Sequence, residues 1–311
     1  MVLKEVMKIA DLLDDPKVSG QSVKEFFLSK FPDTHIEVET FSSSLGSTDM
    51  ISIEIPGSDG KCYGGDAPTI TLLGRLGGLG ARPEIIGMVS DADGAVAALA
   101  SAFKLLTMKK RGDELKGDIF IKTHICPDAP TKPHYPVPFM DSPVDTRTLN
   151  EHEVDDLIDA YISCDTTKGN RIANFRGIAI TPTAKAGYLL KVSEDLINIY
   201  ESTTGEHAKV LALSQQDITP YGNGLTHINS IMQPSVATNK PVVGLALTSQ
   251  TVVAGCATGA SHATDIELAA RFMIEVAKAY GEGRCSFYDE QEYERLQKLY
   301  GSMEHFQQGG N

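Results

Sequence analysis

The segment from residue 89 to 130 concentrates the side chains of this chain that could do chemistry. Asp91 lies in a Ser-Asp-Ala-Asp-Gly turn before a small-residue helix, and His124, Cys126 and Asp128 follow the next strand. Carboxylates and imidazoles bind metals, and a histidine or a thiolate can transfer a proton or attack a carbonyl. Loops at strand ends commonly carry such sites. The alternatives are structural: Asp91 would cap its helix, and His124 and Cys126 would fill a strand end.

Three other polar segments follow expected strands or precede expected helices. Asp165 and Lys168 share a turn that combines acidic, hydroxyl and cationic groups, for which a solvated turn is the alternative. His262 follows a run of small residues that would let the backbone approach a ligand closely, although Ser261 could instead cap the next helix. A polar Gly-rich turn before another expected helix carries three further side chains: Tyr221, Asn223 and His227.

Hydrophobic periodicity predicts strands and helices that alternate along the chain. The expected helices are 3–13, one after Ser19, 92–108, 153–161, 184–203, 225–232 and 263–280, and the expected strands are 35–40, 50–55, 70–73, 85–89, 118–122, 162–163, 177–181, 210–213 and 241–248. This alternation predicts an α/β fold, a three-layer αβα sandwich with a mostly parallel central sheet. We expect one domain over residues 1–311, with a charged helical tail at 285–311. The polar segments should meet at the edge where the parallel strands end.

Composition narrows the class of protein. A net charge of −13 over 311 residues argues against phosphate-rich partners, both nucleic acid and anionic membranes. No apolar run approaches the roughly 20 residues that span a bilayer, and the first residues lack the form of a secretory signal. Five widely spread cysteines do not indicate a disulfide framework. We therefore expect a cytoplasmic protein that acts on a small-molecule substrate or ligand, with a homo-oligomer left open.

The order of these elements resembles that of the co-catalytic di-zinc exopeptidases and deacylases, most closely the glutamyl aminopeptidase and endoglucanase-like branch. The residues that carry the resemblance are Asp91 before a Gly turn and an alanine-rich helix, a Leu-Lys-Gly-Asp lead into a strand at 115–118, Asp165 after another strand, and His262 at the last core helix. The resemblance covers roughly residues 3–282 and implies a zinc-exopeptidase-like fold. The whole chain also resembles an uncharacterised bacterial family described only as a domain of unknown function.

Two departures from the exopeptidase pattern change the expected chemistry. Arg75 stands where the family has the histidine of its first ligand motif, and the family's paired glutamates fall at Pro127 and Asp128. The general base is therefore missing and one ligand is shortened. A guanidinium stays protonated and cannot bind a cation, so Arg75 would occupy a lost metal position and pair with Asp165. The resemblance then implies one divalent metal, zinc first, or none, with four candidate ligands: Asp91, Asp128, Asp165 and His262.

Two hypotheses about function follow. In the first, a metal-dependent hydrolase cleaves an amide or related acyl bond of a small polar molecule. His124 would replace the missing base, Arg75 would bind a substrate carboxylate or an oxyanion, and Cys126 is the alternative nucleophile. In the second, a non-catalytic protein binds a small anionic ligand, with Arg75 in place of the metal. The expected substrate-binding residues are Lys168, Tyr221, Asn223 and His227.

Overall fold

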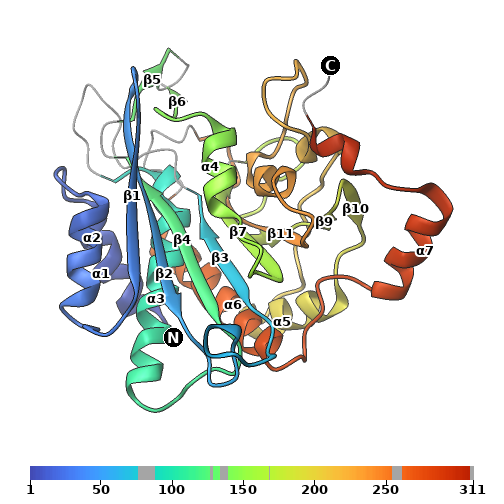
Figure 1. The fold of residues 1–311 in the computed structure, drawn as a ribbon. Coiled ribbons are helices and arrows are strands. Elements are labelled where there is room, and N and C mark those ends of the chain that lie inside the picture. The colour runs from blue at the N-terminus through green and yellow to red at the C-terminus, as the bar shows by residue number, and fades with distance from the viewer. Residues whose placement is uncertain (76–87, 127–128, 134–138, 168, 254–260, 309–311) are drawn as a thin grey trace.

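A computed structural model shows a central sheet with helices on both of its faces (Figure 1). It describes residues 1–75, 88–126, 129–133, 139–167, 169–253 and 261–308. This architecture is the three-layer αβα sandwich that the sequence predicts. None of the described helices combines the length and hydrophobicity that crossing a bilayer requires.

The central sheet is mixed, and its parallel part is confined to the middle. In the described part of the chain the sheet has nine strands: eight follow the order β1-β2-β4-β3-β7-β11-β9-β10, and β8 pairs with β11 outside this order. Strands β4, β3, β7 and β11 run parallel, whereas the flanking strands pair antiparallel. The strands are β1 (Ile36–Ser43), β2 (Gly46–Ile55), β3 (Ile70–Gly74), β4 (Ile119–Ile125), β7 (Ala160–Thr167), β8 (Gly177–Ile180), β9 (Thr183–Lys185), β10 (Tyr188–Leu190) and β11 (Val242–Thr248), with a separate β5 (Thr131–Lys132) and β6 (Phe139–Met140) pair.

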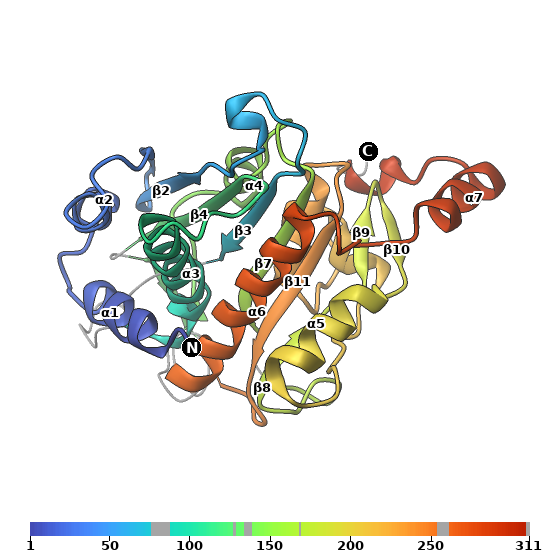
Figure 2. The same cartoon turned by 90° about the horizontal axis from the view of Figure 1, so that it is seen from below.

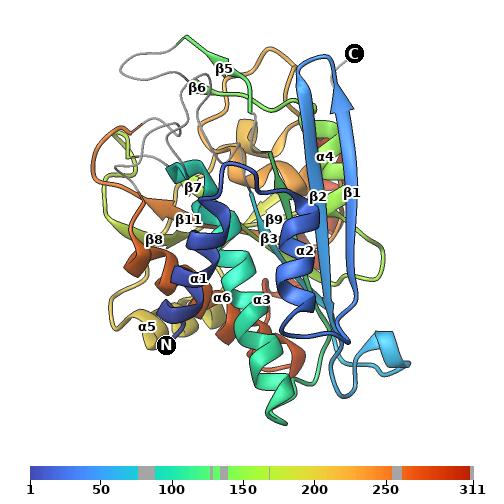
Figure 3. The same ribbon diagram turned by 90° about the vertical axis from the view of Figure 1, so that its left-hand side faces the viewer.

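Helices form the two outer layers. One face is covered by α1 (Leu3–Leu13), α3 (Asp93–Lys110), α5 (Glu194–Thr204) and α6 (Ala263–Gly281), as Figure 2 shows from below. The other face carries α4 (Thr146–Glu153) and the 3-10 segment η4 (Ser230–Val236), with η3 (Gln215–Ile218) beside η4. The remaining elements are α2 (Gly20–Leu28), which packs on β1 and β2 (Figure 3), α7 (Glu290–Tyr300) at the opposite margin, and the short segments η1 (Lys61–Tyr63), η2 (Ser90–Ala92) and η5 (Glu304–Gln307).

The middle of the sheet is buried on both faces, which explains the uninterrupted burial of β3 and β11. Ile70 and Leu72 of β3 belong to the main core with α3 and α6, whereas Leu73 packs in a second core with Ile231 and Met232 of η4. Successive side chains of a strand point to opposite faces, so both faces of β3 must be apolar. The same alternation decides which layer each polar side chain at the strand ends will meet.

The helix expected at 153–161 is wrong. The chain forms α4 up to Glu153 and then returns to the sheet as β7. The Asp145 side chain caps α4 by accepting a hydrogen bond from Thr148 N at 2.9 Å. β7 then pairs with both β3 and β11 in the middle of the sheet. Pairing on two sides outweighs the local helical periodicity of this segment.

Three further expectations differ from the structure. The helix expected at 184–203 begins only at Glu194, because Gly187 at φ +79 turns the chain into a β9–β10 hairpin first. At 225–232 there is no α-helix, and η4 begins at Ser230 instead. At 210–213 the pairing is limited to a bridge between Val210 and Ile180. The strand expected at 85–89 lies mostly outside the described residues.

Two glycines let α3 begin directly against the parallel strands. A Cβ at Gly74 would lie 2.7 Å from the carbonyl oxygen of Gly94. A Cβ at Gly94 would lie 2.6 Å from the carbonyl oxygen of Cys164 and 2.7 Å from that of Arg75. Neither approach leaves room for a methyl group. The pair therefore fixes how closely the start of α3 sits to the ends of β3 and β7.

We expect Gly94→Ala to lower the free energy of unfolding by about 1–3 kcal/mol, the usual cost of forced overpacking. Alanine has the higher helix propensity by about 1 kcal/mol, so a net loss would show that the steric conflict with the two carbonyls dominates. Urea denaturation of the variant and the wild type measures this difference. A variant as stable as the wild type would contradict the close approach of α3 to the strands.

Candidate active site

Three polar side chains stand level with one another at the carboxyl ends of the central parallel strands. Gly74 of β3 pairs with Thr123 of β4 on one side and with Cys164 of β7 on the other. The backbone N–H of Arg75, the residue after Gly74, donates to Cys164 O at 2.8 Å. The pairing of β3 with β7 therefore extends to Arg75. Neighbouring strands lie about 4.8 Å apart. The next residues on the three strands therefore form a polar row across the sheet: His124, Arg75 and Asp165.

A buried ion pair holds the middle of the polar row. Arg75 Nη1 donates to Glu153 Oε2 and, at 3.1 Å, to Asn150 Oδ1, and both acceptors belong to α4. Glu153 Oε1 lies 3.9 Å from Nδ1 of His124. Arg75 is 8% exposed, His124 3% and Glu153 1%. The carboxylate that Arg75 meets is thus Glu153, not the predicted Asp165, and it stands between a guanidinium and an imidazole.

Burial controls the protonation of Glu153. Removal from water raises the pKa of its carboxyl above the ordinary value, and the charge and hydrogen bond of Arg75 oppose this rise without cancelling it. Burial also lowers the pKa of Lys122, a neighbour on β4 that attracts Glu153 more weakly. Glu153 therefore keeps its proton to higher pH than an exposed glutamate would.

The third member of the polar row, Asp165, is linked to the first residue of η4. Ser230 Oγ donates to Asp165 Oδ2 at 3.3 Å, and the Ser230 hydroxyl also lies near the hydroxyl of Tyr221. Burial of its hydroxyl end raises the pKa of Tyr221; the negative charge of Asp165 raises it further, while Arg75 lowers it. Tyr221 therefore stands beside two members of the row.

Asn223 and His227 support the same loop. Asn223 Nδ2 donates to Thr219 Oγ1 at 3.1 Å, and His227 Nε2 lies 2.9 Å from the Thr219 carbonyl oxygen. The His227 ring meets the Tyr221 ring edge-on, with 4.5 Å between the centroids. Of the three side chains predicted in this turn, the contacts place Tyr221 at the polar row and the other two behind it.

Asp91 follows Ser90, whose backbone contacts the strand that carries Asp165. It belongs to η2, and Thr166 Oγ1 donates to the Ser90 carbonyl at 2.6 Å. This bond joins the residue after Asp165 to the residue before Asp91. Helix α3 begins at Asp93 without a side-chain cap. The N-cap residue of α3 is Ala92, whose methyl side chain cannot cap a helix.

His262 follows Ser261, whose side chain is hydrogen-bonded to the start of α3. Ser261 Oγ donates to Oδ1 of the buried Asp93 at 2.6 Å, which ties the starts of α6 and α3 together. His262 itself is the N-cap residue of α6 and makes no side-chain capping bond. Ser261 is thus a link between two helices, not the cap that the alternative interpretation assumed.

The predicted metal ligands can be compared with the structure only in part. Asp128 lies outside the described residues, as does Lys168. Among the side chains that the structure does describe, no three His, Cys, Asp or Glu residues come close enough to hold one ion. Catalytic zinc sites use three protein ligands. Three described candidates have the right chemistry but do not make such a site on their own: Asp91, Asp165 and His262.

Cys126 is placed in an apolar setting. It is 1% exposed and packs with Val89, Ala129 and Met140. An apolar surrounding disfavours the thiolate, which is the reactive form of cysteine. The surroundings of Cys126 therefore do not favour its predicted role as the alternative nucleophile.

Sequence reasoning missed five polar residues that complete the row or tie its supports together: Asp93, Asn150, Glu153, Ser230 and Ser261. For α4 a signal exists in the sequence, because aspartate is a preferred N-cap residue and Asp145 lies directly before the helix. A helix from that point places Asn150 and Glu153 on one side. No local pattern announces Ser230, whose position depends on how η4 folds over the sheet.

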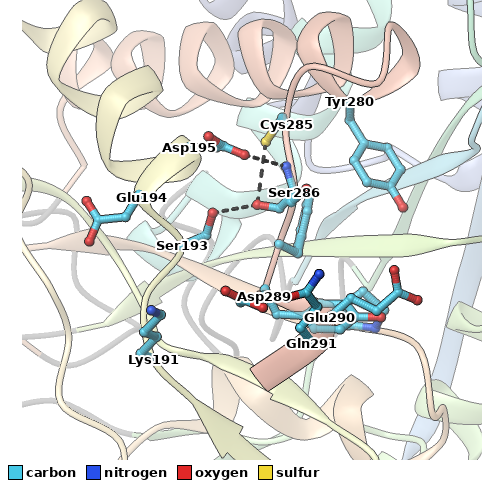
Figure 4. A pocket seen from close by; sticks show the side chains of 13 residues that line it. Lys191, Ser193, Glu194, Asp195, Tyr280, Cys285, Ser286, Asp289, Glu290 and Gln291 are labelled. Atoms are coloured by element: carbon cyan, nitrogen blue, oxygen red, sulfur yellow. Dashed lines mark hydrogen bonds between the residues drawn. The ribbon is translucent and has the colours of Figure 1, made fainter. Parts of the chain in front are cut away.

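A separate cavity of about 700 Å³ opens at the other edge of the sheet (Figure 4). Pro241, just before β11, lines it. Three of its acidic and hydroxyl side chains serve local structure: Ser193 and Asp289 cap α5 and α7, and Asp195 accepts a backbone hydrogen bond. Burial, with a smaller contribution from Asp195, raises the pKa of the Cys285 thiol to about 12. The cavity therefore offers no reactive group comparable to the polar row.

Comparison with known proteins agrees with this architecture. The chain is similar to the solved structure of a cytosol aminopeptidase from Coxiella burnetii, with 14% sequence identity and a TM-score of 0.53, over 89% of this chain and 68% of that one. At this identity the similarity shows an aminopeptidase-like α/β fold. Residues 39–310 match the family described as "Protein of unknown function (DUF1177)", and the chain belongs to that family. No curated protein matches the chain.

The raised pKa of Glu153 gives a pH dependence whose sign can be worked out. The folded chain binds this proton more tightly than the unfolded chain, so the stabilisation is complete below the unfolded pKa of about 4.3 and is lost as the pH rises through the folded pKa. Glu153→Gln lacks this titration. The free energy of unfolding of the wild type minus that of the variant should therefore fall as the pH rises above about 4. The fall is about 1.4 kcal/mol for each tenfold gain in proton affinity.

Urea denaturation at several pH values measures this difference. Glu151→Gln, which removes an exposed carboxylate from the same helix, is the matched control. A wild-type-minus-variant difference that stays flat or rises with pH would show that burial does not dominate the proton affinity of Glu153.

Proposed function

We propose that the protein hydrolyses an amide or related acyl bond in a small molecule that carries a carboxylate. The observation that carries this proposal is the in-register polar row at the carboxyl ends of the parallel strands, with Glu153 buried behind it. In open parallel sheets, ligands bind outside this edge. A cation, an imidazole and a carboxylate side by side there can bind an anion and move a proton in one place.

Arg75 is suited to bind the carboxylate of the substrate. Its Nη1 is fixed by Glu153 and Asn150, while its Nε and Nη2 donate to no other residue in the part of the chain that the structure describes. A guanidinium held on one side can offer its remaining N–H groups to a carboxylate or to an oxyanion. The fixed geometry also means that little side-chain entropy is lost on binding.

His124 is suited to carry the proton. A buried carboxylate 3.9 Å from its Nδ1 stabilises the imidazolium that forms when the ring takes a proton from water. The hydroxide equivalent adds to the carbonyl carbon, and the same proton then passes to the leaving nitrogen as the acyl bond breaks. Glu153 acts here as a positioning residue for both Arg75 and His124.

The exopeptidase resemblance would add a divalent metal near Asp91, Asp165 and His262, but no step above requires it. A second candidate function is a non-catalytic protein that binds small anions. The buried pair of Arg75 and Glu153 favours it, because the pair fills the position where the resemblance places a metal ligand. The two candidates differ in turnover and in metal content.

Turnover is tested with a panel of N-acetyl amino acids and dipeptides, together with metal analysis of the purified protein. We expect cleavage of at least one panel member, and His124→Ala should lower kcat by about 10²–10⁴, the usual contribution of an acid–base group. The fully exposed His207→Ala is the matched control. Near-stoichiometric zinc, manganese or cobalt would support the metal-assisted form of the mechanism.

Arg75→Lys separates binding from chemistry. Lysine keeps the charge but loses the forked geometry, so we expect KM to rise more than kcat falls. No turnover across the panel, no metal and no thermal shift with added zinc would instead support the binding protein. Wild-type kcat in His124→Ala would remove this histidine from the mechanism.

A further inference from the structure

A rigid loop from Thr219 to Asn229 connects η3 and η4 next to the polar row. Its base is fixed by Asp217, which is fully buried. Asp217 Oδ1 accepts hydrogen bonds from Ile228 N at 2.8 Å and Asn229 N at 3.0 Å, and its Oδ2 accepts one from Ser214 N at 2.8 Å. One buried carboxylate therefore holds both ends of the loop.

The loop is also braced across its middle. Thr219 is the centre of this bracing: its carbonyl oxygen accepts a hydrogen bond from Gln233 Nε2 at 2.9 Å and meets Nε2 of His227, while its hydroxyl accepts one from Asn223. A segment pinned at its base and braced inside keeps its shape before a ligand binds.

This fixed loop exposes an unusual amount of apolar surface. Tyr221 is 42% exposed, Leu225 49% and Ile228 50%. Single exposed apolar residues need no explanation, whereas three on one short, ordered loop mark a surface used for contact. The bracing means that these side chains cannot turn inward to escape water.

The loop touches the site through one residue. Ser230, which follows the loop directly, donates to Asp165 Oδ2 at 3.3 Å, and the Tyr221 hydroxyl lies near Ser230, within the electrostatic reach of Asp165 and Arg75. Anything held by Arg75 would therefore extend past the Tyr221 ring toward the outside of the site. The cation and the apolar surface are adjacent parts of one binding region.

We infer that the loop from Thr219 to Asn229 is the apolar wall of the binding region and selects ligands that join an apolar body to a carboxylate. This inference rests on the proposed role of Arg75 as the carboxylate-binding residue. It narrows the substrate to molecules such as acylated or apolar amino acids and excludes small dicarboxylates, whose second charge would meet the uncharged wall.

A homologous series of linear monocarboxylates tests the inference by isothermal titration calorimetry: acetate, butanoate, hexanoate and octanoate. Each methylene that leaves water should tighten binding about fourfold. We expect the dissociation constant of the wild type to fall along the series. Tyr221→Ala should flatten this fall, whereas Tyr221→Phe, which keeps the ring, should preserve it. Leu225→Ser should weaken hexanoate more than acetate.

Leu299→Ser is the matched control, because Leu299 is a 63% exposed leucine on α7, and it should leave the series unchanged. Arg75→Lys should weaken all four ligands by a similar factor. Binding that needs Arg75 but does not depend on chain length would overturn the apolar wall and leave the carboxylate site intact. A chain-length dependence unchanged by Tyr221→Ala would also overturn it. No binding of any member would overturn both proposals.

Discussion

The ion pair between Arg75 and Glu153 is the interaction on which the arrangement of the site depends. Helix α4 has eight residues, too few to be stable on its own, so its position follows from what its side chains contact. Two of those side chains, Glu153 and Asn150, meet the same nitrogen of Arg75. A buried guanidinium without a carboxylate partner is costly. The packing of α4 on the sheet and the orientation of the Arg75 side chain therefore depend on each other.

Small residues at the start of α3 support this arrangement from the opposite layer. Gly74 and Gly94 bring the helix so close that its first turn contacts the backbone of β3 and β7. Ser261 then ties the start of α6 to Asp93. The polar row consequently stands on strands clamped between two layers, and its side chains vary little in position. A site built in this way can discriminate by geometry as well as by charge.

The sequence predicted the layered fold because apolar periodicity and strand-helix alternation are local properties. It placed His124, Arg75 and Asp165 after strands, but it could not supply the register that sets them side by side. It also assigned Glu153 to the wrong helix, since pairing of β7 on two sides is a tertiary effect. The ligand set drawn from the resemblance stays a prediction, with Asp128 outside the described residues. Partners such as Ser230 depend on long-range packing that no short pattern contains.

The outermost strands of the sheet order, β1 and β10, bear on whether two copies of this chain can pair through their sheets. The outer strand β1 carries exposed glutamates at 37 and 39, and an incoming strand would have to bring its backbone alongside both charges. The opposite margin, β10, is three residues long, and its Tyr188 is covered by Tyr293 of α7. Neither edge is a good template for adding a strand. Self-association by adding a strand at β1 or at β10 is thus disfavoured.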